Sequence, residues 1–354
     1  MQKYSFLSVF LGNNSKNEEM ILVTGATGLV GGNLIWHLLQ ENERVVAIRR
    51  PTSNLQPLRT IFNFYTSSPD ACLARIDWKI ADVLDEKSIH QAMKGVSVVY
   101  HCAAVVSFDY AADSILDVNV IGTRNVVRAA IENQVDKLCF VSSIAACGRA
   151  TGNDQIHEDS VWVDSTQRSL YSQSKYLSEQ EVWKGIKNGL NAVIVNPGVI
   201  LGISGTVSGS SQLFSQVRKG LMFYTNGGSG YVDVHDVAKA MMLLTKSAII
   251  GERFILVSEN CSNKDILSWM ADGFGKYRPF IPIGRRVFWA VGLLSEVIGK
   301  VFNFHHLIDR GTARTATNRE FYSNLKIKNS LGFQFAPIEK SIQAICSFML
   351  RNNP

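Results

Sequence analysis

A strand–glycine loop–helix segment near the amino terminus constrains the fold of this chain more than any other feature. The apolar run Met20–Thr24 predicts a buried strand, and the periodic apolar residues of Leu29–Gln40 predict a helix. Between them, the sequence TGATGLVG (residues 24–31) spaces three glycines for a tight turn, a close approach of backbone N–H groups to a pyrophosphate, and close helix–strand packing. The segment predicts a dinucleotide site with the phosphates at the helix N-terminus, contacted by Gly25, Thr27, Gly28, Leu29, Val30 and Gly31.

The first half of the chain alternates strand-like and helical patterns. Further strands are predicted at residues 45–48, 77–80, 96–101, 137–142 and 192–196, and further helices at 86–94, 114–132 and 170–187. Strand–helix alternation implies right-handed crossovers and a parallel sheet that is covered on both faces. We therefore expect an α/β fold with a doubly wound parallel sheet, which binds ligands outside the carboxyl ends of its strands.

The pattern loosens beyond residue 200 and predicts a second, smaller region. Residues 202–209 are rich in Gly and Ser and predict a loop, whereas 264–273, 285–302 and 338–351 have helical patterns. We expect a cofactor domain at 20–200 and a smaller, mostly helical substrate-binding cap at 201–354, with 230–260 returning to the cofactor domain. Residues 1–19 are expected to form a loose N-terminal extension.

Composition excludes several classes of protein. With 354 residues, of which 46% are hydrophobic and 19% charged, the chain can bury a sizeable core, so disorder is excluded. The net charge of +6 comes without a run of basic residues, so no nucleic-acid partner is expected. The six cysteines lie far apart and form no C-x-x-C pair. We expect no metal site and no disulfide framework, and the cytoplasm, a reducing compartment, fits best.

The end of the predicted second strand indicates which dinucleotide is bound. Arg49 and Arg50 occupy the place where a carboxylate would bind the ribose 2′-hydroxyl of NAD, and an arginine there accommodates the 2′-phosphate of NADP instead. NADP(H) is therefore favoured over NAD(H), the alternative being that both arginines are solvated surface charges. Just after the third strand, Asp82 is placed to accept a hydrogen bond from the adenine amino group, and Val83 follows it.

Three residues form a candidate catalytic set. Tyr171 and Lys175 stand at i and i+4 on one face of a predicted helix, and an ammonium beside a tyrosine is expected to lower the phenol pKa, making it a usable acid/base. Ser143 follows the fifth strand, at the same carboxyl edge as the glycine loop, where it can bond the substrate oxygen. Lys175 can also hold the nicotinamide ribose hydroxyls.

These residues identify a resemblance. From about Met20 to the C-terminus, the chain is similar to the extended short-chain dehydrogenase/reductase superfamily, the NAD-dependent epimerase/dehydratase group. The resemblance rests on the features above and on HCAA (101–104), NVIGTRN (119–125), NPGV (196–199), YVDVHDVA (231–238) and the spacing from Ser143 to Gly148. It implies a Rossmann-type fold and a homodimer. It also implies that Ala103 and Ala104 line the cofactor, that Asn119 lies near the active site, and that Pro197 and Val199 contact the nicotinamide.

Departures from the family's patterns narrow the reaction. Dehydratases of this family carry an Asp-Glu pair where this chain has Ile144 and Ala145, and the sugar epimerases usually have an acid and a tyrosine where Arg49 and Cys147 stand. The chain most resembles the dihydroflavonol-reductase and hydroxysteroid-dehydrogenase-like members. We expect an NADP(H)-dependent interconversion of a carbonyl and a secondary alcohol on a partly apolar small molecule. The alternatives are a sugar-nucleotide epimerase and a non-catalytic NADP(H)-binding scaffold.

Two further groups of residues, a set of aromatic and apolar side chains and the segment 285–304, each allow two interpretations. Aromatic and apolar residues that either wall the substrate pocket or belong to the core are Phe108, Tyr110, Phe214, Met222, Phe223 and Tyr224. Residues 285–304 form a basic amphipathic pattern, for which a cap helix or dimer contact is favoured over a helix resting on a membrane surface.

Overall fold

The computed structural model describes residues 19–106, 112–148, 155–163, 168–206, 209–284 and 317–352. The helix expected at 285–302 and the pocket residues Phe108 and Tyr110 lie outside these ranges. Within them, a π-helical turn at Asp117–Ile121 and a 3₁₀ turn at Ile144–Ala146 accompany the following elements: β1 (Met20–Thr24), α1 (Leu29–Gln40), β2 (Arg44–Arg49), α2 (Gln56–Tyr65), α3 (Pro69–Leu73), β3 (Asp77–Ile80), α4 (Glu86–Ala92), β4 (Val98–His101), α5 (Ala112–Leu116), α6 (Gly122–Glu132), β5 (Lys137–Val141), α7 (Leu170–Lys187), β6 (Ala192–Pro197), β7 (Val199–Leu201), α8 (Ser210–Arg218), β8 (Phe223–Thr225), β9 (Gly228–Asp233), α9 (Val234–Lys246), β10 (Glu252–Leu256), β11 (Glu259–Ser262), α10 (Asn263–Gly273), β12 (Ile281–Ile283), α13 (Leu325–Leu331) and α14 (Ile338–Asn352).

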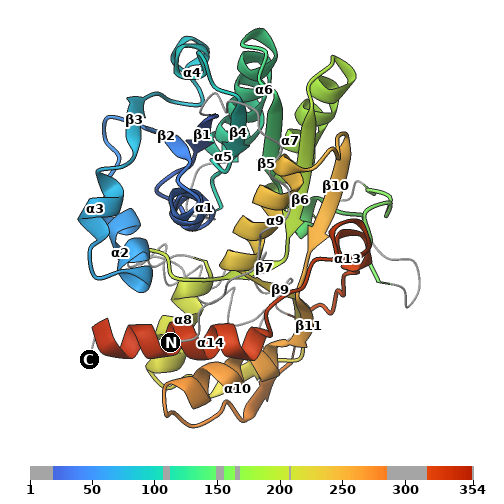
Figure 1. Ribbon diagram of the computed structural model, residues 1–354. Helices are drawn as coiled ribbons and strands as arrows, with labels where there is room; N and C mark the ends of the chain where they lie inside the picture. The colour runs from blue at the N-terminus through green and yellow to red at the C-terminus, as the bar shows by residue number, and fades with distance from the viewer. Residues whose placement is uncertain are drawn as a thin grey trace.

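A parallel sheet forms the centre of the molecule (Figure 1). Within the described residues it has seven strands in the order β3-β2-β1-β4-β5-β6-β10. The chain runs outward from β1 to β3 and then returns to place β4 on the other side of β1, where Leu22 pairs with both Val46 and Val99. The neighbouring carboxyl ends of β1 and β4 therefore mark the point where the strand order reverses, which is where doubly wound sheets bind ligands. The predicted fold class is confirmed.

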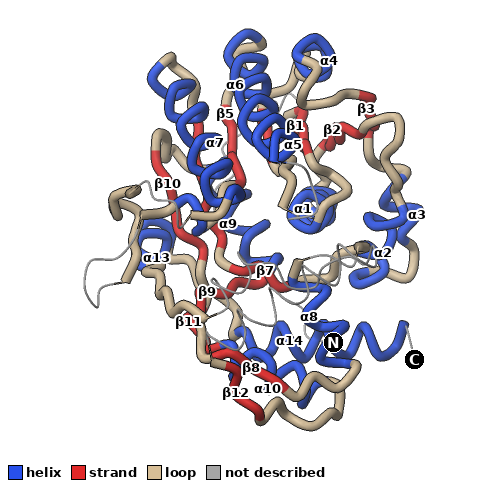
Figure 2. Tube along the Cα trace, turned by 180° about the vertical axis from the view of Figure 1, so that it is seen from behind, coloured by secondary structure: helices blue, strands red, loops and turns tan. Residues whose placement is uncertain are grey.

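Helices cover both faces of this sheet (Figures 1 and 2). Because side chains alternate along a strand, Ile21 and Val23 enter the core beneath α1 and α9, whereas Leu22 enters the core beneath α4, α6 and α7. Both cores consist mainly of fully buried aliphatic side chains from the strands and the facing helices. Two packed faces fix the strand ends, and with them the loops that carry the candidate site.

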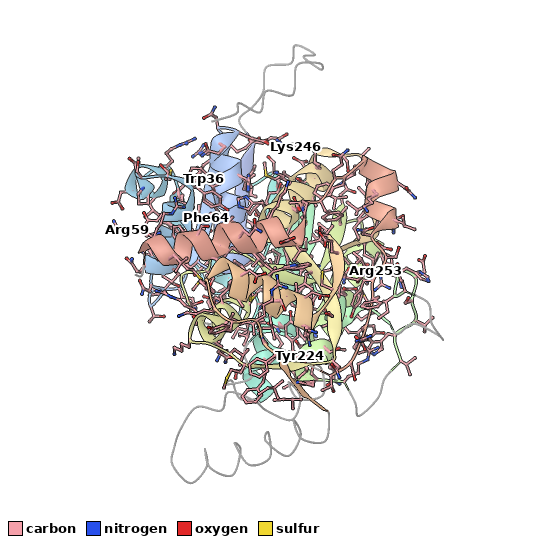
Figure 3. The ribbon with its side chains drawn as sticks, turned by 90° about the horizontal axis from the view of Figure 1, so that it is seen from below. Trp36, Arg59, Phe64, Tyr224, Lys246 and Arg253 are labelled. Atoms are coloured by element: carbon pink, nitrogen blue, oxygen red, sulfur yellow. The ribbon has the colours of Figure 1, made fainter. Side chains whose placement is uncertain are left out.

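The cap lies beyond the carboxyl ends of the strands, at the bottom of Figure 1. Its core includes side chains of α8, α10 and α14. Short strands add a sheet ordered β11-β9-β7 and a β12-β8 pair. Phe64 of α2 contacts Phe348 of α14, with ring centroids 5.2 Å apart, which ties the cap to the sheet domain (Figure 3).

Several expectations about individual elements are corrected or sharpened. The helix predicted at 114–132 is interrupted by the π-helical turn. Phe214 is fully buried core, whereas Met222 and Phe223 are exposed. Within the described ranges, no helix has the length and apolar character needed to cross a membrane, and no group of His, Cys, Asp or Glu side chains is arranged to hold a metal ion.

Candidate active site

The glycine loop is built by direct backbone packing. Gly25 has a φ of +66°, and a Cβ there would lie 2.6 Å from the backbone nitrogen of Ala103. A Cβ at Gly31 would lie 2.3 Å from the carbonyl oxygen of Gly25. Gly28 caps α1 without a side-chain hydrogen bond, and the first turn of α1 contains no acidic residue. The N–H groups from Leu29 onward are therefore free of a competing carboxylate and suit an anion such as a pyrophosphate.

Arg49 and Arg50 stand at the carboxyl end of β2. Arg49 is the last strand residue, and its Nε is buried without a hydrogen-bond partner among the described residues. Arg50 is exposed, and its backbone N–H donates to Ser53 Oγ at 3.0 Å. A buried guanidinium nitrogen without an acceptor is unfavourable, so an anionic oxygen placed there would satisfy it. This feature fits the 2′-phosphate of NADP(H).

Asp82 and Val83 lie at the end of the neighbouring strand β3. Asp82 accepts a hydrogen bond from the Leu84 backbone N–H at 3.0 Å, which folds the segment into a tight turn. The carbonyl of Val83 accepts from Asn125 Nδ2 at 2.9 Å, and its side chain packs where Gly122 has no Cβ. The strand end that carries Asp82 is thus fixed to α6.

The structure brings the three predicted catalytic residues to one place, the carboxyl end of β5. Ser143 follows β5, Tyr171 lies in the first turn of α7, and Lys175 lies one turn later. The side chain of Ser143 lies close enough to the Tyr171 hydroxyl to lower its pKa. The Lys175 ammonium donates to the carbonyl of Val141 at 2.9 Å and lies 5.3 Å from the ring centroid of Phe140.

The pKa values of this set correct one expectation. The sequence predicts that Lys175 lowers the pKa of Tyr171, but burial raises it, and the nearby side chain of Ser143 only partly opposes that rise. The reason is the cost of placing a phenolate in a site withdrawn from water. Burial also lowers the pKa of Lys175, to about 8, so this ammonium holds its proton weakly for a lysine.

Two contacts explain the local sequence around Ser143. Ser172 donates its hydroxyl to the carbonyl of Ala145, which fastens the first turn of α7 to the 3₁₀ turn after Ser143. A Cβ at Gly148 would lie 2.3 Å from the carbonyl oxygen of Val161. Because Gly148 has no side chain, the backbone at Val161 can pack against it, five residues after Ser143.

Asn119 holds two segments of the site together. Its Oδ1 accepts from the backbone N–H of Val105 at 2.7 Å, and its Nδ2 donates to the Val105 carbonyl at 3.0 Å and to Ser174 Oγ at 2.9 Å. The residue is 1% exposed and lies in the π-helical turn. π-Helical turns occur frequently at functional sites. This geometry places Asn119 between the loop after β4 and helix α7.

Sequence reasoning did not single out a hydrogen-bonded chain centred on His101. The Thr24 hydroxyl oxygen lies 3.1 Å from the backbone nitrogens of both Cys102 and Ala103 and 2.7 Å from His101 Nδ1. His101 Nε2 lies 3.0 Å from the hydroxyl oxygen of Thr123. Burial lowers the pKa of His101 to about 3. The polar Thr24 at the end of an apolar strand was the signal that could have indicated this link.

The remaining predicted cofactor residues lie at the same carboxyl edge. Ala103 and Ala104 lie in the loop after β4, beyond Cys102, and are half-buried. Pro197 ends β6 and is buried, and Val199, which begins β7, is 37% exposed. Asn196 Nδ2 donates to the carbonyl of Ser143 at 2.9 Å, so the ends of β5 and β6 are held in register.

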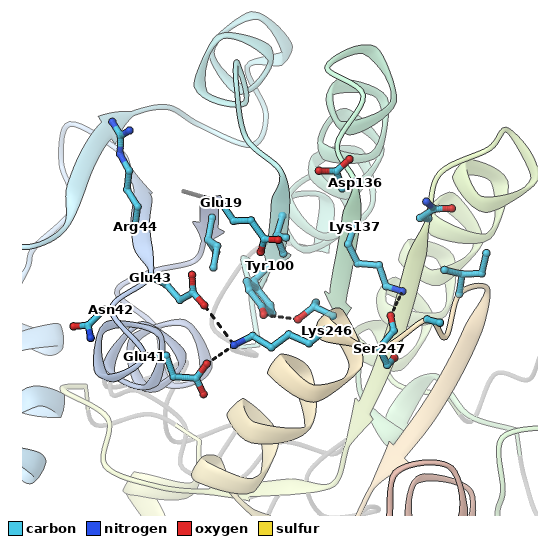
Figure 4. Close-up of a pocket in the computed structure, with 16 residues that line it drawn as sticks. Glu19, Glu41, Asn42, Glu43, Arg44, Tyr100, Asp136, Lys137, Lys246 and Ser247 are labelled. Atoms are coloured by element: carbon cyan, nitrogen blue, oxygen red, sulfur yellow. Dashed lines mark hydrogen bonds and ion pairs between the residues drawn. The ribbon is translucent and has the colours of Figure 1, made fainter. Parts of the chain in front are cut away.

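A cavity of about 920 Å³ lies at the opposite, amino-terminal edge of the sheet (Figure 4). Both of its lysines have partners: Lys246 Nζ lies 3.4 Å from Glu43 Oε1, and Lys137 Nζ donates to the carbonyl of Ser247 at 3.3 Å. The cavity lies across the sheet from Ser143, so it is not the candidate active site.

Comparisons with known proteins agree with this geometry. Residues 21–255 match the model of the NAD dependent epimerase/dehydratase family. The chain is similar to a putative dihydroflavonol 4-reductase of Synechocystis sp., with 32% identity over 72% of each chain. It is also similar to sterol demethylase protein B of Methylococcus capsulatus, with 31% identity over 79% of this chain and 82% of that one.

Solved structures show the same fold. The crystal structure of gox2253 is 28% identical, with a TM-score of 0.78, and the match covers 95% of this chain and 99% of that one. DesIV, a dTDP-glucose 4,6-dehydratase from Streptomyces venezuelae with NAD bound, has a TM-score of 0.72 at 17% identity, covering 94% and 97% of the two chains. With the glycine loop and the strand-end residues in place, this chain is an NAD(P)-dependent enzyme that belongs to the NAD-dependent epimerase/dehydratase family.

Proposed function

We propose that the chain is an NADP(H)-dependent oxidoreductase that interconverts a carbonyl and a secondary alcohol on a partly apolar small molecule. The observation that carries this proposal is the meeting of Ser143, Tyr171 and Lys175 at the end of β5, at the same sheet edge as the glycine loop. This set supplies a proton donor, a hydrogen bond for the reacting oxygen and a neighbouring positive charge.

Each side chain has a role that follows from its surroundings. Bound NADP(H) supplies or accepts the hydride. The pKa of Tyr171 is raised by burial, so its hydroxyl keeps the proton at neutral pH and can donate it to a carbonyl oxygen. Ser143 hydrogen-bonds that oxygen and orients it. Lys175, with a pKa of about 8, is mostly protonated at neutral pH and stabilises the charge left on Tyr171.

The choice of NADP(H) rests on Arg49. Its buried Nε at the end of β2, which has no partner among the described residues, suits a phosphate oxygen better than it suits a ribose hydroxyl, because the bond to an anion is charge-assisted. Arg50, exposed beside it, adds a second positive charge to the same strand end.

A reductase acting on a partly apolar substrate is supported by three observations. Ile144 is buried among apolar residues and Ala145 follows it, so neither position supplies the acid or base that water loss needs. Val199 presents an exposed apolar side chain at the sheet edge. Relatives named for dihydroflavonol, sterol and cinnamoyl-CoA chemistry include reductases.

A cofactor-oxidation screen tests the proposal. NADPH consumption is followed at saturating cofactor over aldehydes and ketones that range from sugar-derived to steroid-like, with NADH in parallel and Tyr171→Phe as the inactive control. We expect turnover of at least one apolar ketone or aldehyde with NADPH. Epimerisation of a sugar nucleotide without net NADPH oxidation would contradict the proposal. So would tight NADPH binding without turnover of any of the carbonyl compounds.

A further inference from the structure

A buried polar cluster lies directly beneath the proposed catalytic residues. At its centre is Glu179, whose side chain is 1% exposed. One carboxylate oxygen, Oε1, accepts from Ser142 Oγ at 2.6 Å and also from Asn196 Nδ2. The other, Oε2, lies 3.2 Å from Arg253 Nη1. Arg253, labelled in Figure 3, donates through Nε to the carbonyl of Glu158 at 2.7 Å. The carboxylate thus links α7 to the ends of β5 and β6 and to β10.

The position of Glu179 connects it to Ser143 from two sides. Ser142 precedes Ser143, and its hydroxyl ends on Glu179. Asn196 donates both to Glu179 and to the carbonyl of Ser143 itself. Glu179 also follows Lys175 by one helical turn on α7, so it lies beneath the ammonium on the same helix face. The side chains of Glu179 and Lys175 are therefore neighbours on one helix face, and their opposite charges attract each other.

The charge of Glu179 matters because the other groups facing Lys175 are neutral. Burial raises the pKa of the Cys102 thiol to about 12 and lowers the pKa of His101 to about 3, so both are uncharged near neutrality. Burial lowers the pKa of Lys175, and first Cys102 and then Glu179 oppose that fall. Burial raises the pKa of Glu179 itself above its usual range, and the bonds from Ser142 and Asn196 and the charge of Arg253 oppose only part of that rise.

We propose that Glu179 is a positioning residue of this site, which fixes the turn that presents Ser143 and places a carboxylate one helical turn from Lys175. The inference rests on the proposed function for its kinetic consequence. Its electrostatic consequence belongs to the folded protein and can be measured without any substrate. Glu179 touches neither substrate nor cofactor in this assignment and acts through Ser143 and Lys175.

The first experiment measures the pKa of Lys175 directly. Protein carrying ¹³C-labelled lysine is titrated by NMR, and the Lys175 resonance is assigned by its loss in Lys175→Met. In Glu179→Gln we expect the pKa of Lys175 to fall below the wild-type value of about 8 by about one unit, because the opposing charge is removed and Arg253 is left unpaired. Glu179→Asp keeps the charge and withdraws it by one methylene, so a smaller fall in the same direction is expected.

Glu181→Gln is the matched control. Glu181 lies on the same helix but pairs with Arg124 at 3.2 Å and Lys184 at 2.8 Å on the outer side. Removing the charge of Glu181 should leave the pKa of Lys175 unchanged. Equal pKa values of Lys175 in Glu179→Gln and Glu181→Gln would overturn the proposal.

Kinetics separate the two parts of the role. The alkaline limb of kcat/KM against pH should move down with the Lys175 pKa in Glu179→Gln. Ser142→Ala removes a hydrogen bond but keeps the carboxylate, so kcat should fall while the pH profile stays in place. A shifted Lys175 titration in a protein that turns over no substrate would refute the proposed function and leave this inference standing. If the enzyme reduces a carbonyl compound but the Lys175 pKa is the same in Glu179→Gln as in the unsubstituted protein, the proposed function stands and this inference is refuted.

Discussion

Replacing Arg49 is the sharpest test of cofactor choice. Arg49→Met removes the guanidinium and keeps an unbranched apolar side chain at the end of β2. The strand itself should persist, because the backbone of Arg49 stays paired with β3. Arg49 is opposite Ile80 in the β2–β3 register, and its carbonyl accepts a hydrogen bond from the Ala81 N–H at 3.1 Å. The perturbation is therefore confined to the side chain.

The magnitude follows from the unpartnered nitrogen. A hydrogen bond to a charged group contributes about 1.5–3 kcal/mol, which corresponds to roughly a 10- to 150-fold change in affinity. Because Arg49 Nε is buried and has no acceptor among the described residues, no existing bond must be broken first, and the change should lie in the upper part of that range. The affinity for NADH, which lacks the 2′-phosphate, should change little.

The assay compares NADPH and NADH binding by cofactor fluorescence and then compares kcat/KM for both. Arg44→Met is the matched control, because Arg44 is an exposed arginine at the other end of the same strand and at the opposite edge of the sheet. The reasoning would be refuted by an unchanged NADPH affinity in Arg49→Met. It would also be refuted if NADPH and NADH weakened equally, since the effect would then be structural.

Three further changes test other parts of the molecule. Tyr171→Phe should lower kcat/KM by about 10²–10⁴ while NADPH still binds, and a parent-like rate would show that another group moves the proton. Thr24→Val leaves two backbone N–H groups without their acceptor and should lower the free energy of unfolding by about 2–4 kcal/mol, as measured in urea; an unchanged midpoint would contradict the linking role. Burial raises the pKa of Asp236 from 3.8 to about 6, so the folded chain prefers the protonated acid, and the stability this gives is complete below pH 4 and lost as pH rises through 6. Asp236→Asn should therefore stabilise the protein by about 1–3 kcal/mol at pH 8 and hardly at all at pH 4, and an equal effect at both pH values would exclude this cause.

The sheet and the edge that carries the site follow from local signals in the sequence. The glycine loop fixes β1 and α1, and the alternation that follows allows few topologies other than a doubly wound sheet. Ser143 and Tyr171 could be placed together because the ends of parallel strands share an edge. Three-residue strands such as β7 and β8 could not be predicted, because so few residues show no periodicity.

Other features depend on burial that a sequence does not display. The buried face of α7 includes Ser172, Ser174, Ser178 and Glu179, so a pattern of apolar residues does not identify it. Glu179 therefore resembles a solvent-exposed charge when the sequence is read alone. The direction of the Tyr171 pKa shift has the same origin, since it reflects the loss of water around the phenol rather than the identity of its neighbours.

The chain of hydrogen bonds through His101 has only one allowed direction. Thr24 Oγ1 accepts from the N–H groups of Cys102 and Ala103, so its own hydrogen is directed to His101 Nδ1. The imidazole must then carry its hydrogen on Nε2, where it meets the oxygen of Thr123. A second proton on the ring would face the hydrogen of Thr24.

This one-way order removes a common source of pH dependence. The Thr123 hydroxyl donates in turn to the carbonyl of Asn119 at 2.6 Å. If any of these hydrogen bonds ran in the opposite direction, a backbone group at one end of the chain would lose its partner. A histidine beside a cofactor is usually the first candidate for a change of charge near neutral pH. Here the imidazole acts as a fixed, uncharged connector, so a change in activity with pH near 8 should be traced to the lysine at position 175, whose pKa lies there.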